Sequence, residues 1–270
     1  MQFRFPKSLV LVLVITFGFR QSEVHHEPVS HDIRLLASVW YALSAENQAC
    51  YLQTYQLAGY QLSKVLQGNK TKKKSAIVTD LDETLLDNSP WTLRVLLEGK
   101  DYPDYWNEWE KAGRAKAFPG AVDFFTQAHK KGAEIFYVSN RMHQNLDATI
   151  RNLQNLGLPN ADSAHIFLKT IESNKVSRRK SISEKHEIVM LLGDNLADFD
   201  GVWEKAQLKD RTEAVANHKL DWGTRFIVFP NPVYGGWKDG IFNYQHKWKA
   251  YQSDSIWQNA IQTYLKENSF

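Results

Sequence analysis

The 270-residue sequence lacks the features that mark several classes of protein. Its one cysteine, Cys50, excludes an intramolecular disulfide framework and any zinc site made of several thiolates. It also lacks an excess of charge of one sign: 33 basic and 30 acidic residues give a net charge of +3. A dedicated nucleic-acid binder usually carries a strongly basic domain, so we expect no nucleic-acid partner. Hydrophobic residues make up 43% of the chain, which excludes wholesale disorder.

The N-terminal segment has no apolar run long enough to span a membrane comfortably. Arg4 and Lys7 precede an apolar run over 9–19, whereas a spanning helix needs roughly 20 apolar residues. These proportions predict a secretory signal peptide over residues 1–22 and a secreted or periplasmic protein, with an ordinary buried helix as the alternative. No cysteine lies near the end of the run, so we expect no lipid anchor.

The next segment is rich in helical patterns. Apolar residues recur at three- and four-residue spacing over 33–66, without proline, and predict one long helix or two. We expect an N-terminal helical extension over about 31–68. Cys50 lies in its apolar part, which predicts a buried thiol that acts as a small hydrophobe.

Short apolar runs rich in β-branched and aromatic residues follow, and helical patterns separate most of them. This alternation predicts an α/β fold: a Rossmann-like parallel sheet with helices on both faces. The expected strands cover 76–79, 134–138, 165–168, 188–192 and 225–229, and the expected helices cover 121–131, 143–155, 174–185 and 199–207.

One aromatic stretch, 86–118, does not fit a single crossover helix. It predicts a small inserted helical cap, in which Trp106 and Trp109 serve as packing residues. A helical tail is expected over about 243–268. Residues 23–270 are therefore expected to form one domain with a helical extension, a cap insertion and a tail.

Acidic side chains follow two of the expected strands. Asp80 and Asp82 come directly after the first, and Asp194 and Asp198 come after the fourth. Ligands of such sheets bind beyond the carboxyl ends of the strands, so we expect these groups to converge. Carboxylates held close together need a cation or a shared proton.

Polar and basic groups are expected at the same edge. Ser139, Asn140 and Arg141 follow the second strand, and Lys175 opens the helix before the fourth. Carboxylates, hydroxyls and a lysine suit a hard divalent cation, Mg²⁺ above all, together with a phosphate. In such a site an aspartate can attack phosphorus while a second carboxylate transfers a proton.

Four blocks resemble the motifs of the haloacid dehalogenase-like phosphohydrolases: DLDET at 80–84, SNR at 139–141, Lys175, and GDNLADF at 193–199. Two longer stretches, VTDLDETLLDNSP at 78–90 and NPVYGGW at 231–237, resemble more closely the signatures of bacterial class C (DDDD-type) acid phosphatases. The resemblance covers about residues 38–242.

The resemblance implies that Asp80 is the nucleophile and Asp82 the general acid and base. It implies that Mg²⁺ is held by the Asp80 side chain, the Asp82 backbone carbonyl and Asp194. Asp198 would support this metal shell or Lys175.

The resemblance also implies how substrate is held. Ser139, Asn140 and Lys175 would bind the phosphate, with Lys169 as a rival for the lysine role. The family hydrolyses phosphomonoesters at acid pH, often 5′-nucleotides, and stacks the base between aromatic rings. Trp91 and Tyr234 match those positions, although Trp91 is larger than the expected ring. The family further suggests a homodimer.

Two other functions stay open at this point. A non-catalytic protein could keep the fold to bind a nucleotide or haem, which the aromatic content makes plausible. The intact set of aspartates and Lys175 counts against it. A phosphotransferase would pass the phosphoryl group to an alcohol instead of water, and the sequence does not separate it from a hydrolase.

Overall fold

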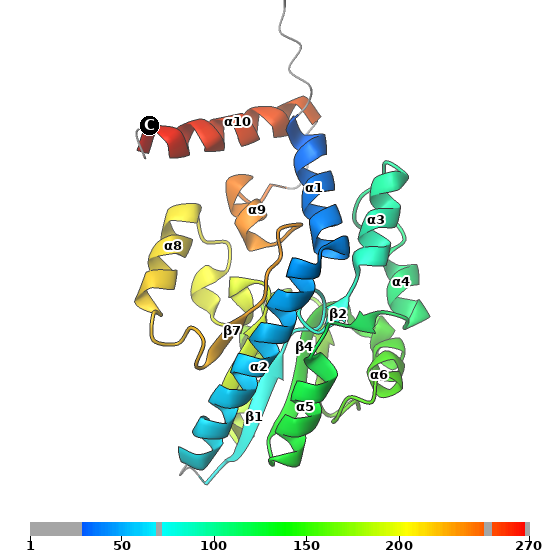
Figure 1. Cartoon of the computed structure of the whole chain (residues 1–270), viewed down its shortest axis with the longest axis vertical. Coiled ribbons are helices and arrows are strands. Elements are labelled where there is room, and N and C mark those ends of the chain that lie inside the picture. The colour runs from blue at the N-terminus through cyan, green and yellow to red at the C-terminus, as the bar shows by residue number, and fades with distance from the viewer. Residues whose placement is uncertain (1–28, 69–71, 246–249, 268–270) are drawn as a thin grey trace, which may run out of the picture.

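The structure is a computed structural model that describes residues 29–68, 72–245 and 250–267 (Figure 1). The expected signal peptide, residues 1–22, lies outside this part of the chain. Among the described residues, no helix has the length and apolar character needed to cross a membrane.

A five-stranded sheet with the order β5-β4-β1-β6-β7 forms the centre of the molecule. Its neighbouring strands are all parallel, which confirms the predicted architecture. The strands are β1 (Lys74–Thr79), β4 (Glu134–Met142), β5 (Ile166–Lys169), β6 (His186–Gly193) and β7 (Phe226–Val228).

The strand register places the end of β1 beside β4 and near the end of β6. Thr79, the last residue of β1, pairs with Tyr137 of β4 and with Leu192 of β6. Asp80 therefore leaves the sheet directly after Thr79 and Asp194 leaves it after Gly193, at the same edge, whereas β4 continues to Met142.

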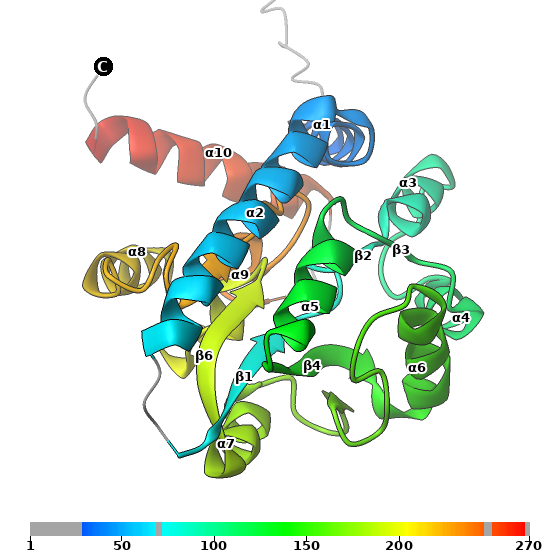
Figure 2. The same ribbon diagram turned by 60° about the horizontal axis from the view of Figure 1, so that its bottom comes forward.

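Alternation along β1 supplies a core to each face of the sheet, because successive strand side chains point to opposite faces. Ile77 packs in one cluster, with residues of α2 (Ala45–Gly68) and α5 (Ala121–Lys130). Figure 2 shows these two helices side by side over the sheet. Val78 packs in the other cluster, with residues of α7 and α8. These last two helices are Val176–Lys185 and Leu208–Asn217.

The N-terminal extension consists of two helices, α1 (Val29–Leu43) and α2, separated at Ser44. The buried face of α2 carries Tyr51, Tyr55, Ala58 and Leu62 at helical spacing. Cys50 is exposed, so the prediction of a buried thiol was wrong. It precedes Tyr51 by one residue and therefore points away from the buried face.

Residues 86–118, which we call the cap segment, leave the sheet between β1 and α5. Two short antiparallel strands close its base, β2 (Leu86–Asp87) and β3 (Lys116–Ala117). Between them lie α3 (Ser89–Leu97) and α4 (Trp106–Ala112). Trp91 of α3 packs edge-on against Trp106 of α4, with ring centroids 4.8 Å apart.

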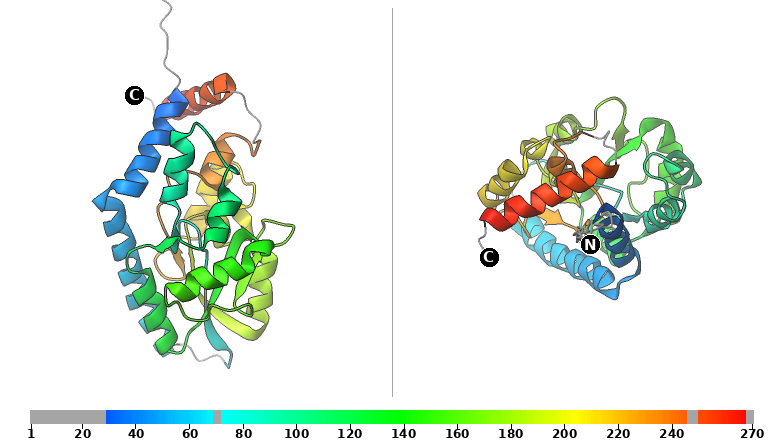
Figure 3. Two further views of the ribbon diagram at one scale, coloured as in Figure 1. Left: turned by 90° about the vertical axis from the view of Figure 1, so that its right-hand side faces the viewer. Right: turned by 90° about the horizontal axis from the view of Figure 1, so that it is seen from above.

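The remaining helices follow β4 and β7 in the chain. A short 3₁₀ turn, His143–Asn145, leads into α6 (Leu146–Asn155) after β4. After β7 come α9 (Gly236–Ile241) and α10 (Ala250–Glu267). Figure 3 shows α10 lying across the end of the molecule beside α1.

The helix expected over 199–207 was wrong. One 3₁₀ turn, Leu196–Asp198, precedes this range, and a second, Gly201–Trp203, lies within it. The second turn begins where the Asp200 side chain accepts a hydrogen bond from the Val202 backbone. It cannot be extended into a regular helix because Lys205 is left-handed, with φ of 52°. The regular helix in this region is α8, which the sequence patterns did not predict.

Candidate active site

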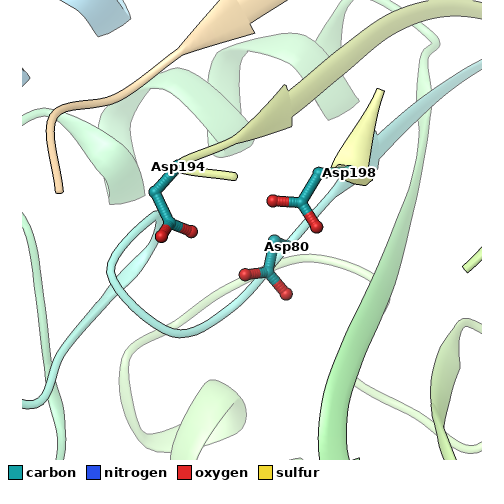
Figure 4. Close-up of side chains that lie close together, drawn as sticks. All are labelled: Asp80, Asp194 and Asp198. Carbon is teal, nitrogen blue, oxygen red and sulfur yellow. The ribbon is translucent and has the colours of Figure 1, made fainter. Parts of the chain in front are cut away.

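Three aspartates meet at the carboxyl edge of the sheet. Asp80 follows β1, Asp194 follows β6, and Asp198 ends the 3₁₀ turn beyond it. One carboxylate oxygen from each lies within 4.8 Å of the others, and Figure 4 shows the three side chains converging. The predicted convergence is therefore seen for these three aspartates, whereas Asp82, the fourth expected member, is not part of this cluster.

Asp198 reaches the site because the chain folds back sharply after β6. Its carboxylate accepts a hydrogen bond from the Asn195 backbone at 3.0 Å, and the Asn195 side chain caps the same turn. A Cβ atom on Gly193 would lie 2.5 Å from the Asp198 side chain. Glycine is therefore required at position 193 because the Asp198 side chain lies too close for a Cβ atom, and not because of its backbone φ angle.

Lys175 lies between two of the aspartates. Its Nζ is 2.5 Å from Asp80 Oδ1 and 2.6 Å from Asp198 Oδ1, and all three side chains are nearly buried. It is the residue just before α7, where the sequence analysis placed it. Three carboxylates and one ammonium leave a formal charge of −2, which matches one divalent cation.

The pKa values reflect this imbalance. Burial raises the pKa of Asp80 well above its ordinary value, although Lys175 opposes the shift. Burial and the charge of Asp198 raise the pKa of Asp194 to about 6. Burial lowers the pKa of Lys175, but the two carboxylates outweigh it and the net shift is upward. Carboxylates held close together need a shared proton or a cation to remain stable.

The donor set fits magnesium. All three groups are carboxylate oxygens, which Mg²⁺ prefers over softer ligands. Two neutral residues orient Asp194 in addition: Thr84 Oγ1 donates to Oδ1 at 3.1 Å, and Asn231 Nδ2 donates to Oδ2 at 2.8 Å. Neither residue had been assigned a role, although both lie within the motifs quoted above.

Asp82 has a different environment. Its Oδ1 accepts from Arg141 Nη2 at 2.7 Å and from Nε at 3.0 Å, and the Arg141 side chain is buried. Burial disfavours the guanidinium, but Asp82 outweighs it and raises the pKa of Arg141. Ser139 Oγ donates to Asp82 Oδ2 at 3.3 Å. Sequence reasoning gave Arg141 no partner, because nothing along the chain shows which carboxylate it meets.

Asn140 points to another basic residue. Its Oδ1 accepts from Arg178 Nη2 at 2.7 Å, and Arg178 Nη1 donates to the Ser139 carbonyl at 2.6 Å. Arg178 belongs to α7, the helix that Lys175 precedes. The sequence analysis missed it, although its place three residues after Lys175 was the available signal, because that spacing sets it on the same side of the helix.

The two aromatic residues expected to clamp a base differ in exposure. Tyr234 is 39% exposed, and its hydroxyl donates to the buried carboxylate of Glu83. Trp91 is 8% exposed, packs against Trp106, and donates from its indole to the Asp104 carbonyl at 2.9 Å. Burial raises the pKa of Glu83, and Asp82 adds to the shift.

Three tyrosines of the N-terminal extension hold the loop that follows Asp80. The hydroxyls of Tyr41 and Tyr51 donate to the Glu83 carbonyl, and that of Tyr55 donates to the Thr84 carbonyl at 2.9 Å. Glu83 is left-handed, with φ of 57°. These contacts explain part of the high aromatic content, which the sequence alone left unassigned.

A parallel sheet with carboxylates and a lysine at its carboxyl edge is the arrangement that the resemblance to haloacid dehalogenase-like enzymes implies. The chain matches the family described as HAD superfamily, subfamily IIIB (acid phosphatase), over residues 31–237. It belongs to this family of acid phosphatases and is accordingly a phosphoric monoester hydrolase.

Solved structures agree with this assignment. The chain is 41% identical to the class C acid phosphatase from Bacillus anthracis, with a TM-score of 0.81, over 85% of this chain and 96% of that one. A second structure of that protein, with tungstate bound, gives a TM-score of 0.82 at the same identity and coverage.

Proposed function

We propose that this acid phosphatase is exported, depends on Mg²⁺, and hydrolyses phosphomonoesters, including 5′-nucleotides, through an aspartyl-phosphate. The observation that carries the proposal is the cluster of Asp80, Asp194 and Asp198, in which Lys175 contacts Asp80 and Asp198 and a formal excess of two negative charges remains. A buried excess of this size suits a divalent cation and a phosphate bound together.

Asp80 is the proposed nucleophile. A carboxylate oxygen of Asp80 forms a bond to phosphorus while the bond between phosphorus and the leaving oxygen breaks, and the leaving oxygen keeps the electron pair. Asp82 gives that oxygen a proton, so the alcohol departs neutral. Water then attacks the phosphorus, Asp82 takes the proton from the water, and the Asp80 carboxylate is released with inorganic phosphate.

The proposed cation ligands are the side chains of Asp80 and Asp194 and the backbone carbonyl of Asp82. Asp198 supports this arrangement by holding Lys175, 2.6 Å away. A bound Mg²⁺ would neutralise negative charge on the transferring phosphoryl oxygens.

Lys175, Ser139 and Asn140 are the proposed phosphate-binding residues. Lys175 already contacts the nucleophile, and Ser139 contacts the proposed acid Asp82. Asn140 is held by Arg178, which adds positive charge on this side of the site. Positioning and charge neutralisation are most of what a protein can contribute to phosphoryl transfer.

Tyr234 and Trp91 are proposed to bind the leaving group, with a nucleotide base stacked against a ring. The exposed ring of Tyr234 supports its part, because its hydroxyl is anchored to Glu83 while the ring remains open to solvent. Trp91 is 8% exposed and packs against Trp106 within the cap segment, so it would offer the base less ring surface than Tyr234.

Organisation, export and assembly are further parts of the proposal. We propose one domain over 23–270, and export directed by the signal over 1–22. A homodimer is supported by leucines exposed along α1, Leu36 and Leu43. Sedimentation of the mature protein tests the dimer, and sequencing the N-terminus of secreted protein tests the signal.

The decisive experiment measures hydrolysis of 4-nitrophenyl phosphate and of several 5′-nucleotides at pH 5–6, with Mg²⁺ and with a chelator, for the wild type and for Asp80→Asn. Loss of activity in the variant and in chelator is expected. Activity that survives either change contradicts the mechanism, and tight nucleotide binding without hydrolysis favours the binding-protein alternative.

The proposed clamp is tested separately by Tyr234→Ala. We expect a larger loss of kcat/KM on nucleotides than on small phosphates, because only nucleotides carry a base to stack. An equal loss on both contradicts the clamp. Adding an alcohol acceptor to the same assay separates phosphotransfer from hydrolysis.

A further inference from the structure

Asn88 lies where the loop after the nucleophile meets the cap segment. It is the residue before α3, and its side chain is 1% exposed. An asparagine at this position usually accepts a hydrogen bond from the first turn of the helix. The Asn88 side chain makes no such bond to α3. Its amide binds other partners, so α3 lacks this side-chain cap. Departures from local sequence preferences, such as capping, are common at functional sites.

Three side chains use the Asn88 amide. Nδ2 donates to Asp82 Oδ1 at 2.9 Å and to Glu83 Oε1 at 3.1 Å. Oδ1 accepts from Trp109 Nε1 of the cap segment at 2.7 Å. A flipped amide would set its carbonyl oxygen against two carboxylates and its NH₂ group against an indole N–H. The partners therefore fix the orientation of the amide.

These contacts leave the two oxygens of Asp82 unequal. Oδ1 accepts from Asn88 at 2.9 Å and from Arg141 Nη2 at 2.7 Å. Oδ2 has only longer contacts, from Arg141 Nε at 3.1 Å and from Ser139 at 3.3 Å. Oδ2 is therefore the oxygen that can carry the proton for the leaving group.

We propose that Asn88 is a positioning residue. It holds Asp82 Oδ1 and connects it to Trp109. The position of the cap segment relative to the sheet therefore sets how well Asp82 protonates a poor leaving group. This inference rests on the proposed role of Asp82 as general acid. When the phosphorus–oxygen bond breaks, the electron pair stays on the leaving oxygen and the proton moves to it from Asp82 Oδ2. A nitrophenolate leaves readily without that proton, whereas an alkoxide does not.

The test compares kcat/KM on 4-nitrophenyl phosphate with kcat/KM on glycerol phosphate. Asn88→Ser retains a good helix-capping residue but is too short to reach three partners. We expect it to lower kcat/KM about tenfold on glycerol phosphate and less than threefold on nitrophenyl phosphate, because general acid catalysis contributes about 10²–10⁴-fold. Trp109→Phe keeps an aromatic ring, although a smaller one, and removes the indole donor; it is expected to change the ratio of the two kcat/KM values in the same direction by a smaller factor.

Gln144→Ala is the matched control. Gln144 also connects the core to the cap segment, through Asn107 at 3.4 Å, but makes no hydrogen bond to Asp82. In this variant the ratio of the two kcat/KM values is expected to stay at the wild-type value. If Asn88 had a purely structural role, Asn88→Ser would lower kcat/KM equally on both substrates, and that result overturns the proposal.

Asp82→Asn separates the two levels of the argument. If it leaves the substrate ratio unchanged, Asp82 is not the acid and the proposed mechanism fails. If it shifts the ratio while Asn88→Ser and Trp109→Phe do not, only the inference about Asn88 fails. In the Asp82→Asn background, Asn88→Ser is expected to add no further shift, because both changes act through one group. An added shift contradicts the proposal.

Discussion

The two edges of the central sheet each carry a cluster of charged side chains, and the clusters differ in balance. At the carboxyl edge, Asp80, Asp194 and Asp198 converge, and the ammonium of Lys175 contacts two of them, Asp80 and Asp198. At the amino edge, His165 contacts two carboxylates, Asp162 at 2.7 Å and Glu134 at the start of β4, and Glu134 is surrounded by basic groups. Its partners are Lys74 at 2.9 Å, His165 at 2.7 Å and His186 at 3.3 Å.

The difference teaches how a site for a charged ligand can be distinguished from a structural ion-pair cluster. The amino-edge cluster satisfies its carboxylate within the protein: burial alone would raise the pKa of Glu134, but hydrogen bonds from Lys74 and His165 lower it to about 2. The carboxyl-edge cluster does the opposite, since burial raises the pKa of Asp80 and Asp194. We infer that only the cluster with uncompensated charge binds a ligand.

The largest expected contrast separates activity from stability. Asp80→Asn is expected to lower kcat by about 10⁴-fold or more while the protein stays folded, because the proposed nucleophile is lost. Glu134→Gln, at the opposite edge, is expected to retain kcat within about twofold, since no catalytic step reaches it. Steady-state kinetics and circular dichroism on both variants check this. A large loss of kcat in Glu134→Gln would break the comparison.

A pair of lysine variants sharpens the comparison between the two clusters. Lys175→Met leaves three buried carboxylates without a cation, and breaking a buried pair costs about 3–5 kcal/mol. Lys74→Met removes a lysine whose side chain is 59% exposed, and such pairs are worth about 1 kcal/mol or less. Urea unfolding without metal measures both. Equal losses would mean that the two clusters do not differ in the way proposed.

The fold was predictable because its signals are local. Each strand is a short apolar run, and the carboxyl-edge rule placed Asp80 and Asp194 together without any knowledge of contacts. Capping residues and Lys205 in the left-handed region decided the course of the chain after Asp198, and these override the weak periodicity seen over 199–207.

The supporting contacts could not be predicted from sequence. Tyr51 meets the Glu83 carbonyl from a helix 32 residues earlier, and nothing in its helical pattern names that partner. Asn88 reads as an ordinary helix cap, and only tertiary structure shows its side chain turned toward Asp82. Sequence therefore identified the residues of the proposed chemistry but missed those that hold them in place.

Metal removal gives the next contrast in size. At 100 times its dissociation constant, a ligand that binds only the folded state stabilises it by about 2.7 kcal/mol. Mg²⁺ is expected to raise the melting temperature of the wild type and of Glu134→Gln alike, and to have little effect on Asp194→Asn. Calorimetry with Mg²⁺ and with chelator measures this. A full shift in Asp194→Asn would remove Asp194 from the proposed ligands.

The smallest expected effect is a pH dependence confined to the amino edge. The pKa of Glu134 is lowered from 4.5 to about 2 in the folded protein. A carboxyl group with a lowered pKa stabilises the fold fully above its unfolded value, and this contribution is lost as the pH falls from about 4.5 toward 2. Because Glu134 lies near the surface, we discount the contribution to about 1 kcal/mol.

The unfolding free energy of Glu134→Gln should therefore fall below that of the wild type by about this amount at pH 6, and the two should converge near pH 2. Urea unfolding across this range measures the difference. A constant gap at every pH would show that Glu134 acts by packing and not by charge, and the amino edge would then offer no electrostatic counterpart to the active site.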